Sequence, residues 1–276
     1  MNQKKYFYFA FLIFLVLCGS FALQAVCSAE LDANDTAVVT QQDDILVQEQ
    51  PETSDVVKAE NAASFAQLNQ DVGTTGNTVE LTKNYTRTTG DPSNGIQLSR
   101  DVTINGNGNV IIDGNKQARI FMINNGATVT LKGITFINAH GNGDGGAIYV
   151  DNGILNLEDC NFINNNATNR GGAVFIAWNN NAGSYAIRNC NFTNNTALRD
   201  GIINSEDGNK NFVIESSTFE NNAVQYGWGG ALRLSANSVT IKDSKFRNNS
   251  ITAANGNQGF GAAVYASGQD TIETVN

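Results

Sequence analysis

One frame of residues recurs five times in this 276-residue chain, and it restricts the fold more than any other feature. Each copy is marked by a phenylalanine, and successive copies are 26, 30, 27 and 27 residues apart. Apolar residues stand seven and five positions before each phenylalanine, and an asparagine stands two positions after it. The five phenylalanines are Phe136, Phe162, Phe192, Phe219 and Phe246. Repetition of this regularity predicts a repeat architecture.

The apolar spacing within each copy is that of β-strands. Positions minus seven and minus five, counted from the phenylalanine, alternate with other residues, as in a strand with one buried face. A small or apolar residue at minus two accompanies the phenylalanine, so the chain must bend between minus five and minus two. A third apolar run follows glycine, at 145–150, 171–176, 229–234 and 261–266, with 200–203 as a degenerate member. Three short strands in about 27 residues predict an all-β parallel solenoid of about six to seven coils.

Stacking of the coils would place like residues about 4.8 Å apart. Phenylalanine and aliphatic ladders would fill the core, because one coil cannot bury its own inner face. The asparagines at plus two would lie at a bend and hydrogen-bond the backbone or one another, and the glycine before the third strand would permit a positive φ. The outward residues at minus four alternate in charge, which favours stacked neighbours. They are Lys132, Glu158, Arg188, Glu215 and Lys242.

The first 57 residues lack the repeat and divide into two segments. Residues 1–29 carry Lys4 and Lys5, an apolar run and small residues ending at Ala29, which predicts a secretory signal peptide. A retained membrane anchor is the alternative, although the apolar run is short for a span. Residues 30–57 are acidic and lack apolar periodicity, which predicts a disordered leader.

The charge of the chain limits its partners. The formal net charge is −9, and it would become −11 after removal of a signal peptide that contains two lysines and no acidic residue. An acidic, lysine-poor protein is poorly suited to nucleic acid or to an anionic membrane. We therefore expect no nucleic-acid partner and no membrane insertion once the signal peptide is removed.

Residues 58–276 are predicted to form one β-helix domain, of which residues 58–94 are the N-terminal cap. Ser64 fits the N-cap of a short amphipathic helix, which would cover the apolar end of the first coil. At the other end, Ile272 and Val275 repeat the minus-five and minus-two positions. The C-terminal end is therefore expected to be open or truncated.

Two cysteines, Cys160 and Cys190, share the minus-two column of neighbouring coils. Their expected Cα separation of about 4.8 Å lies within the range that a disulfide tolerates. Export favours oxidation, whereas an inward-facing pair would pack as two small apolar thiols. The sequence leaves both states open.

Many polysaccharide lyases and hydrolases have a parallel β-helix fold. A suitably spaced pair of carboxylates would therefore indicate an enzyme of this kind. Glycoside hydrolysis needs two carboxylates about 5 to 9.5 Å apart. Asp159 and Asp243 share the minus-three column, but Asn189 and Ser216 stand between them, which places the two acids three coils apart. They cannot act together.

Three further signals are weak. His140, the one histidine, is expected to be a solvated turn residue rather than a base. The run from Gly143 to Gly146 looks like a single calcium-binding glycine and aspartate repeat, which lacks ligands without a stacked partner. The tripeptide from Gln269 to Thr271 matches one used by pectin methylesterases, without the rest of that site. We therefore predict no catalytic, cofactor-binding or metal-binding residues.

Loops offer the best candidates for a binding surface. The candidates are two longer inserts, Trp178–Ser184 and Ser250–Gly259, together with Trp228. Glycosylation sequons are also present, and those at bends, Asn166 and Asn248, would be accessible. The six sequons begin at Asn34, Asn84, Asn166, Asn191, Asn194 and Asn248.

The repeat motifs resemble a known family. Gly-Gly-Ala-Ile (145–148) and Gly-Gly-Ala-Val (171–174), together with Phe-Ile-Asn-Asn (162–165) and Phe-Thr-Asn-Asn (192–195), resemble the repeats of polymorphic outer-membrane proteins. The layout from about residue 60 to residue 276 is similar to that of adhesin-like surface proteins of methanogenic archaea. This resemblance implies a right-handed, pectin-lyase-like β-helix displayed at the cell surface, and its motifs are structural ones that imply no functional residue.

The sequence therefore favours an exported, non-catalytic, adhesin-like protein, secreted or held at the cell surface. Its β-helix would be a stalk that presents a lateral binding surface, with polysaccharides or surface proteins of other cells as partners. A carbohydrate-active enzyme, a polysaccharide lyase or hydrolase, or a lectin with a loop-borne site is the alternative. A spacer without any ligand is a third possibility.

Overall fold

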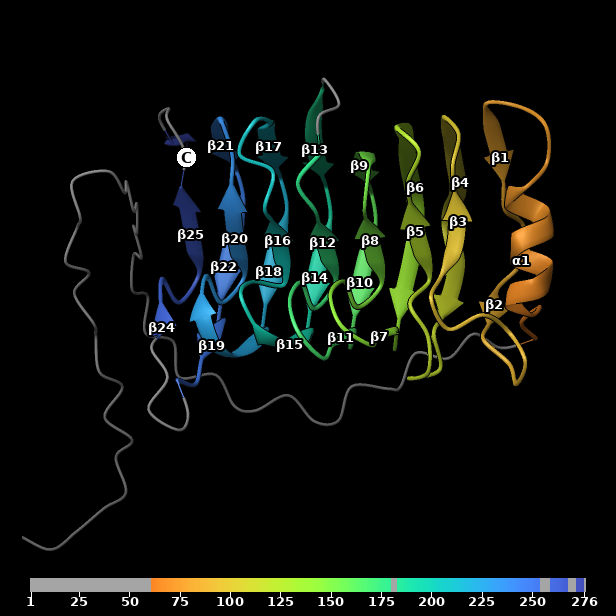
Figure 1. The fold of residues 1–276 in the computed structure, drawn as a ribbon, viewed down its shortest axis with the longest axis horizontal. Helices are drawn as coiled ribbons and strands as arrows, with labels where there is room; N and C mark the ends of the chain where they lie inside the picture. The colour runs from red at the N-terminus through yellow and green to blue at the C-terminus, as the bar shows by residue number, and fades with distance from the viewer. Residues whose placement is uncertain (1–60, 180–182, 254–258, 268–271, 276) are drawn as a thin grey trace, which may run out of the picture. The chain divides into compact units, whose positions relative to one another are not determined.

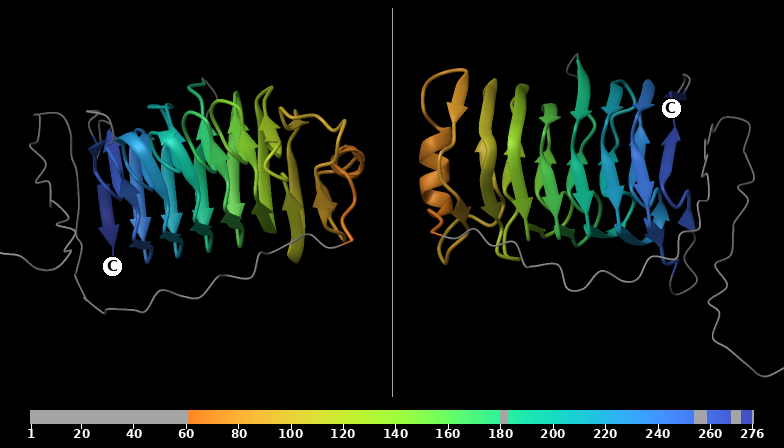
Figure 2. Two further views of the ribbon diagram at one scale, coloured as in Figure 1. Left: turned by 90° about the horizontal axis from the view of Figure 1, so that it is seen from below. Right: turned by 180° about the vertical axis from the view of Figure 1, so that it is seen from behind.

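The computed structural model describes residues 61–179, 183–253, 259–267 and 272–275. They form a parallel β-solenoid of about 6 turns of roughly 27 residues, with one short helix at the N-terminal side. Figure 1 shows the coils side by side from α1 (Phe65–Val72) to β25 (Val264–Ser267), and the two further views show the same row (Figure 2). The predicted all-β parallel solenoid is confirmed. The predicted signal peptide and acidic leader lie outside the described residues.

The largest sheet has 13 strands that pair in parallel between adjacent coils. A typical coil contributes two consecutive strands, one with positions minus seven and minus five and one with the phenylalanine. In β4 and β6 these two strands are continuous, and this joins them into one sheet. The strands are β1 (Thr78–Glu80), β2 (Tyr85–Thr86), β4 (Val102–Asp113), β6 (Ala127–Ile137), β9 (Gly153–Glu158), β10 (Asn161–Ile163), β13 (Ser184–Arg188), β14 (Asn191–Thr193), β17 (Asn211–Glu215), β18 (Thr218–Glu220), β21 (Ser238–Lys242), β22 (Lys245–Arg247) and β26 (Ile272–Val275).

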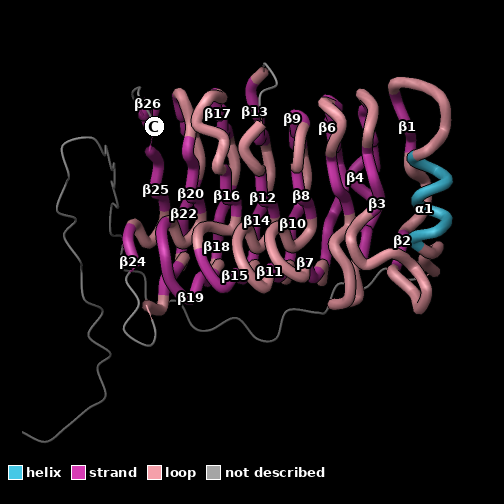
Figure 3. Tube along the Cα trace, in the orientation of Figure 1, coloured by secondary structure: helices cyan, strands magenta, loops and turns pink. Residues whose placement is uncertain are grey.

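The runs that follow glycine form a second sheet of seven strands. A third, six-stranded sheet was not predicted from the sequence, because its strands are short and several have only one buried side chain, which gives no period of two. Most coils therefore have four strands rather than three, separated by short loops (Figure 3). The second sheet contains β3 (Ile96–Leu98), β5 (Phe121–Ile123), β8 (Ile148–Val150), β12 (Val174–Ile176), β16 (Ile203–Ser205), β20 (Leu232–Ser235) and β25; the third contains β7 (His140–Gly141), β11 (Asn166–Ala167), β15 (Thr196–Arg199), β19 (Ala223–Trp228), β23 (Ser250–Ile251) and β24 (Gly259–Phe260).

The predicted bend between minus five and minus two is made by one residue in the left-handed conformation at minus three. Gly133, Asp159, Asn189, Ser216 and Asp243 occupy this position, with φ of 58, 54, 53, 49 and 50°. The left-handed residue breaks the alternation of the strand, so that residues on both sides of it face inward. The residue at minus three is therefore a corner of the backbone in every copy.

The predicted corner before the third strand is also confirmed. Gly145, Gly171, Gly201, Gly229 and Gly261 have φ between 65 and 71°. A Cβ atom added to Gly171 would collide with the carbonyl oxygen of Val174. Only glycine fits this corner without strain.

The phenylalanine frame forms one continuous stack, as predicted. Adjacent rings from Phe136 to Phe246 have centroids 4.7, 4.8, 4.7 and 4.9 Å apart, with interplanar angles of 18, 5, 1 and 4°. The strand register places each phenylalanine opposite the next, and Ile112 of the first full coil opposite Phe136. The stack therefore fixes the register of the coils as well as filling the core.

A column of buried asparagines runs beside the stack at plus three. Asn165, Asn195 and Asn222 are fully buried. The side chain of Asn195 donates to the carbonyl of Phe162 at 2.9 Å and to Oδ1 of Asn222 at 3.1 Å, and its Oδ1 accepts from the backbone N–H of Asn165 at 2.9 Å. The plus-two asparagines lie at a bend, as predicted, with positive φ such as 55° at Asn194, and in this column Asn248 donates to Oδ1 of Asn221 at 3.2 Å. The buried column at plus three was not predicted.

The outward column at minus four forms ion pairs between neighbouring coils. Lys132 Nζ lies 2.6 Å from Glu158 Oε2, and Arg188 Nε lies 2.9 Å from Glu215 Oε2. These side chains are substantially exposed, so each pair contributes no more than about 0.2 to 1 kcal/mol. They favour the register more than they stabilise the fold.

The predicted cap helix is confirmed as α1. Ser64 accepts a hydrogen bond from the backbone N–H of Gln67 at 3.2 Å. The apolar face of the helix, Phe65, Leu68 and Val72, is buried on the first coil. Asp91, which the sequence did not indicate, also accepts from the N–H groups of Phe65 and Ala66, both at 3.1 Å, and satisfies two free donors of the first turn.

The register predicted for the last strand is wrong. In β26, Ile272 pairs with Val239 and Thr274 with Ile241, so Ile272 lies in the minus-seven column rather than the minus-five column. A shift of two residues keeps the same strand parity, and the apolar pattern alone does not exclude it. Residues 268–271, which precede β26, lie outside the described residues.

Cys160 and Cys190 are free thiols, and both are buried. The hydrogen bond with Cys160, together with burial, raises the pKa of Cys190 far above its ordinary value. Ser217 continues the column, and its hydroxyl accepts from the backbone N–H of Cys190 at 3.1 Å. The two cysteines thus act as small core residues in this structure.

Replacing Asn195 by alanine tests the asparagine column. Asn195→Ala removes the partners of the Phe162 carbonyl and of the Asn165 N–H, and each buried group left unpaired costs about 1 to 3 kcal/mol. We expect lower midpoints of thermal and urea unfolding. Asn194→Gly, at the exposed neighbouring turn position, preserves the positive φ and is expected to stay within about 0.5 kcal/mol of the parent protein. Equal losses in both variants would contradict the role of the column.

Candidate binding surface

Two columns of side chains meet where the corner glycine leads into the seven-stranded sheet. One column is the middle, outward-facing residue of each strand, and the register pairs these residues from coil to coil. The other column is the residue immediately before each corner glycine. We call the two columns together the corner surface. It comprises Tyr149, Phe175, Asn204, Arg233 and Tyr265 on the strands, and Asp144, Arg170, Asp200, Trp228 and Phe260 before the glycines.

The N-terminal half of the corner surface is closed by its own groups. The guanidinium of Arg170 lies 4.6 Å from the ring centroid of Phe175, and only 1% of Phe175 is exposed although it faces outward. Arg170 also pairs with Asp144, with Nη2 to Oδ2 at 2.8 Å, and with Glu206. Every charge here has a partner, which leaves little for a ligand to contact.

The C-terminal half exposes its aromatic rings. Trp228 is 39% exposed and Phe260 is 43% exposed. Their ring centroids are 6.3 Å apart with an interplanar angle of 16°, and the ring of Tyr265 lies 6.0 Å from that of Trp228. Arg233, which pairs in register with Tyr265, adds a half-buried guanidinium to this half. Trp228, Phe260 and Tyr265 thus form an exposed aromatic cluster, with the guanidinium of Arg233 beside it.

Buried polar contacts hold this aromatic cluster in position. Oδ1 of Asp200 accepts from the backbone N–H of Trp228 at 3.0 Å, and Asn204 donates to the carbonyl of Asp200 at 2.9 Å. Arg233 donates to the carbonyl of Ser205 at 2.9 Å. Burial lowers the pKa of Arg233 and the nearby Asp200 raises it, and the guanidinium keeps its charge.

The closed and open halves of the corner surface meet at the degenerate coil, which contains residues 200–203. In this coil the paired strand residue, Ile203, comes two positions after Gly201, whereas Val174 comes three after Gly171. An asparagine, Asn204, therefore stands where the preceding coils have an aromatic ring. In the two preceding coils an arginine covers the ring, since Arg119 lies 5.1 Å from the ring centroid of Tyr149 and Arg170 covers Phe175. This arrangement ends at the degenerate coil.

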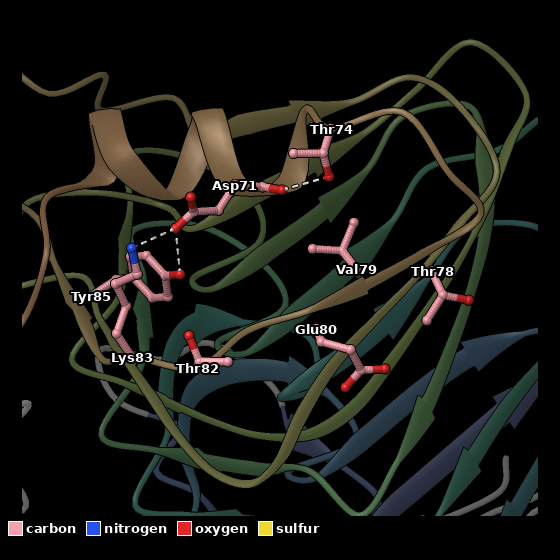
Figure 4. Close-up of a pocket in the computed structure, with 8 residues that line it drawn as sticks. All are labelled: Asp71, Thr74, Thr78, Val79, Glu80, Thr82, Lys83 and Tyr85. Carbon is pink, nitrogen blue, oxygen red and sulfur yellow. Dashed lines mark hydrogen bonds and ion pairs between the residues drawn. The ribbon is translucent and has the colours of Figure 1, made fainter.

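A shallow pocket of about 260 Å³ lies between α1 and the first strands (Figure 4). Its central carboxylate, Asp71, accepts from the hydroxyl of Tyr85 at 2.7 Å and from Gln67 at 2.9 Å, and it lies 3.4 Å from Lys83 Nζ. These contacts attach the cap helix to the first coil. We therefore assign this pocket a structural role.

The carboxylates singled out in the sequence have structural roles. Asp159 and Asp243 are exposed corner residues on coils that are three apart. Asp144, within the calcium-like run, is used by Arg170 and by Asn169, whose Nδ2 donates to it at 2.8 Å. The structure therefore brings none of these three acids together.

His140 differs from its prediction. It is a half-buried residue of β7 that pairs with Asn166, not a solvated turn residue. Its backbone N–H donates to the carbonyl of Ala118 at 2.9 Å. The third sheet, which the sequence did not reveal, accounts for this difference.

The other predicted candidates are dispersed. Trp178 is 57% exposed, outside the corner surface, and parts of both inserts lie outside the described residues, as does the run from Gln269 to Thr271. Of the two sequons expected to be accessible, Asn166 is half-buried and donates to Thr196 at 2.7 Å, whereas Asn248 is exposed and donates to Asn221 at 3.2 Å.

In the described ranges, no group of three or more histidine, cysteine, aspartate or glutamate residues could hold a metal ion. Within the same part of the chain, no helix is long and apolar enough to cross a membrane.

Comparison with known proteins adds no identification. No protein-family model, no curated protein and no solved structure matches the chain. The fold and the corner surface therefore place the chain in the structural class of parallel β-solenoid proteins, and its function is argued from its own residues.

Sequence reasoning singled out Trp228 but missed its partners. Phe260 and Tyr265 carry no motif, and Arg233 belongs to an ordinary strand. The available signal was the residue before each corner glycine, which reads Asp, Arg, Asp, Trp and Phe along the chain. Aligning the copies on this glycine as well as on the phenylalanine would have placed Trp228 beside Phe260.

The attachment of the cap helix should depend on pH. Burial favours a raised pKa for Asp71, but hydrogen bonds from Tyr85 and Gln67 and the contact with Lys83 outweigh it and leave the pKa below its ordinary value. The carboxylate therefore stabilises the folded state above about pH 4, and this contribution is lost as the pH falls through the lowered pKa.

Asp71→Asn is thus expected to lower the thermal midpoint at pH 7, and to differ less from the parent protein at pH 3. Thr82→Val, in the same pocket but without a titratable group, is the control. A difference between the parent protein and Asp71→Asn that stays constant over this range would contradict the assignment.

Proposed function

We propose that this chain is an exported, non-catalytic, adhesin-like surface protein whose solenoid presents the open half of the corner surface to a glycan. The exposed pair of rings, Trp228 and Phe260, is the observation that carries the proposal. Contiguous exposed apolar patches mark interaction sites, and aromatic residues are enriched in binding interfaces. The flat apolar face of a sugar packs on an aromatic ring, and its hydroxyl groups hydrogen-bond to polar neighbours. The half-buried guanidinium of Arg233 supplies such a neighbour.

The repeat geometry also suits an extended polysaccharide. Successive coils rise by about 4.8 Å, which is close to the length of one pyranose unit. A chain laid along the solenoid axis would therefore meet equivalent positions on successive coils. Trp228 and Phe260 occupy such equivalent positions, because they pair in register in β19 and β24.

Several observations favour binding over catalysis. The acidic candidates Asp159 and Asp243 are corner residues three coils apart, and Asp144 is paired with Arg170. At the open half, Asp200 lies near Arg233 and accepts a hydrogen bond from the backbone of Trp228. This carboxylate is therefore already occupied by structural contacts. A polysaccharide lyase or hydrolase remains the alternative that product analysis would detect.

Export rests on residues 1–29, whose composition is that of a secretory signal peptide. Protein recovered from the medium or from the cell surface is expected to begin at Glu30 when its N-terminus is sequenced. An intact N-terminus in a cytoplasmic fraction would contradict this part of the proposal.

An array of immobilised polysaccharides, with analysis of soluble products, tests the binding function. We expect saturable binding without turnover. Trp228→Ala should weaken binding at least about tenfold, because aromatic residues at the centre of a binding site contribute most of its energy. Trp178→Ala is the matched control, since this tryptophan is 57% exposed but lies outside the corner surface, and its binding should be unchanged.

Three outcomes would contradict the proposal. Release of shortened or unsaturated sugars would identify an enzyme. Equal losses in the two tryptophan variants would remove the corner surface as the site. Absence of binding across the array would favour a spacer.

A further inference from the structure

A cluster of four polar side chains is buried away from the corner surface, between the turn before β17 and the residues after β12. Asp207 is fully buried, and Tyr185, Lys210 and Asn179 are 1%, 2% and 4% exposed. Burying a lysine and an aspartate costs several kcal/mol for each ion, and a single ion pair often fails to compensate. Neither the stacked core nor the corner surface uses this amine.

The four side chains converge from two neighbouring coils. Lys210 Nζ lies 3.1 Å from Asp207 Oδ2 and donates to the backbone carbonyl of Asn179 at 3.4 Å. The side-chain amide of Asn179 donates to the hydroxyl of Tyr185 at 3.1 Å, and this hydroxyl donates to the carbonyl of Gly153 at 3.1 Å. Burial raises the pKa of Tyr185, and the nearby Asp207 adds to the rise. An amine, a carboxylate and a carboxamide thus share one enclosed site.

These three groups are the components of an amide exchange. A neutral lysine amine is a nucleophile, a carboxamide carbon is an electrophile, and a carboxylate beside the amine is a base. The reaction needs the neutral amine, and Oδ2 of Asp207, 3.1 Å from Nζ of Lys210, is placed to take the proton.

We infer that Lys210 and Asn179 form an intramolecular isopeptide bond, with Asp207 as the base. The bond between Nζ of Lys210 and Cγ of Asn179 forms, and the bond between Cγ and Nδ2 of Asn179 breaks. Asp207 takes protons from the lysine nitrogen and delivers them to the leaving nitrogen. The ammonium group and the carboxamide give a secondary amide and an ammonium ion, and Asp207 returns to a carboxylate. Atoms and charge balance without a cofactor or an oxidant.

This bond would join turns on neighbouring coils across 31 residues of sequence. The Lys210 turn lies between two strand ladders, because β16 ends at Ser205 and β17 begins at Asn211. A covalent link there would resist separation of the coils, because it restricts the unfolded chain as other cross-links do.

Peptide mapping by mass spectrometry tests the inference on the full chain. We expect a branched tryptic species that joins residues 171–188 to residues 200–233, since the modified Lys210 is no longer a cleavage site. Its mass should equal the sum of the two peptides minus one ammonia. A succinimide at an Asn-Gly pair also loses ammonia, but it leaves Lys210 free, so the map distinguishes the two.

Variants define the roles of the residues. Lys210→Met and Asp207→Asn should each abolish the branched species, whereas Lys245→Met, at an exposed lysine, should retain it. Complete cleavage after Lys210 in the unfolded parent protein, with an unmodified peptide 171–188, would overturn the inference. This result needs only the parent protein, so it stands even where a variant fails to fold. A branched species that persists in Asp207→Asn would remove Asp207 as the base.

Discussion

Parallel backbone pairing between coils, held in one register, is the constraint on which the rest of this structure depends. Each coil must repeat the outline of its neighbour, or the hydrogen bonds along the ladders are lost. Residues with positive φ at minus three, at plus two and at the corner glycine give each coil the same bends. Variation in length is confined to the turns, as in the copy with a spacing of 30 residues, whose extra residues fall between β12 and β13.

The same stacking turns single residues into columns, and the inner and outer columns follow different rules. Inside, the columns must be filled by rings, aliphatic groups and fully hydrogen-bonded amides, because an unpaired polar group is costly there. Outside, the side chains are free to vary from coil to coil. The corner surface uses this freedom: its first half pairs arginine with aromatic rings and acids, and its second half exposes Trp228 and Phe260.

Two kinds of buried polar group contrast in this core. The amides at plus three are neutral, and each one bonds to the backbone and to the next amide, so the column extends through successive coils at little electrostatic cost. The Lys210 and Asp207 pair is charged and local, and it belongs to one pair of turns. Hydrogen bonding alone explains why the plus-three amides are buried. The burial of Lys210 and Asp207 is explained if the lysine amine is a reactant.

The amino-acid sequence by itself determined the coil length, the stacked phenylalanines, the bend at minus three, the corner glycines and the cap helix. These features are set by spacing and by local backbone preferences, which repeat in every copy and so reinforce one another. The tertiary structure alone decided the third sheet, the register of β26, the role of the plus-three asparagines and the meeting of Trp228 with Phe260 and Tyr265. The physical reason is that these features depend on which residues of different coils lie side by side. Turn geometry fixes that arrangement, and the apolar pattern leaves it open by steps of two residues.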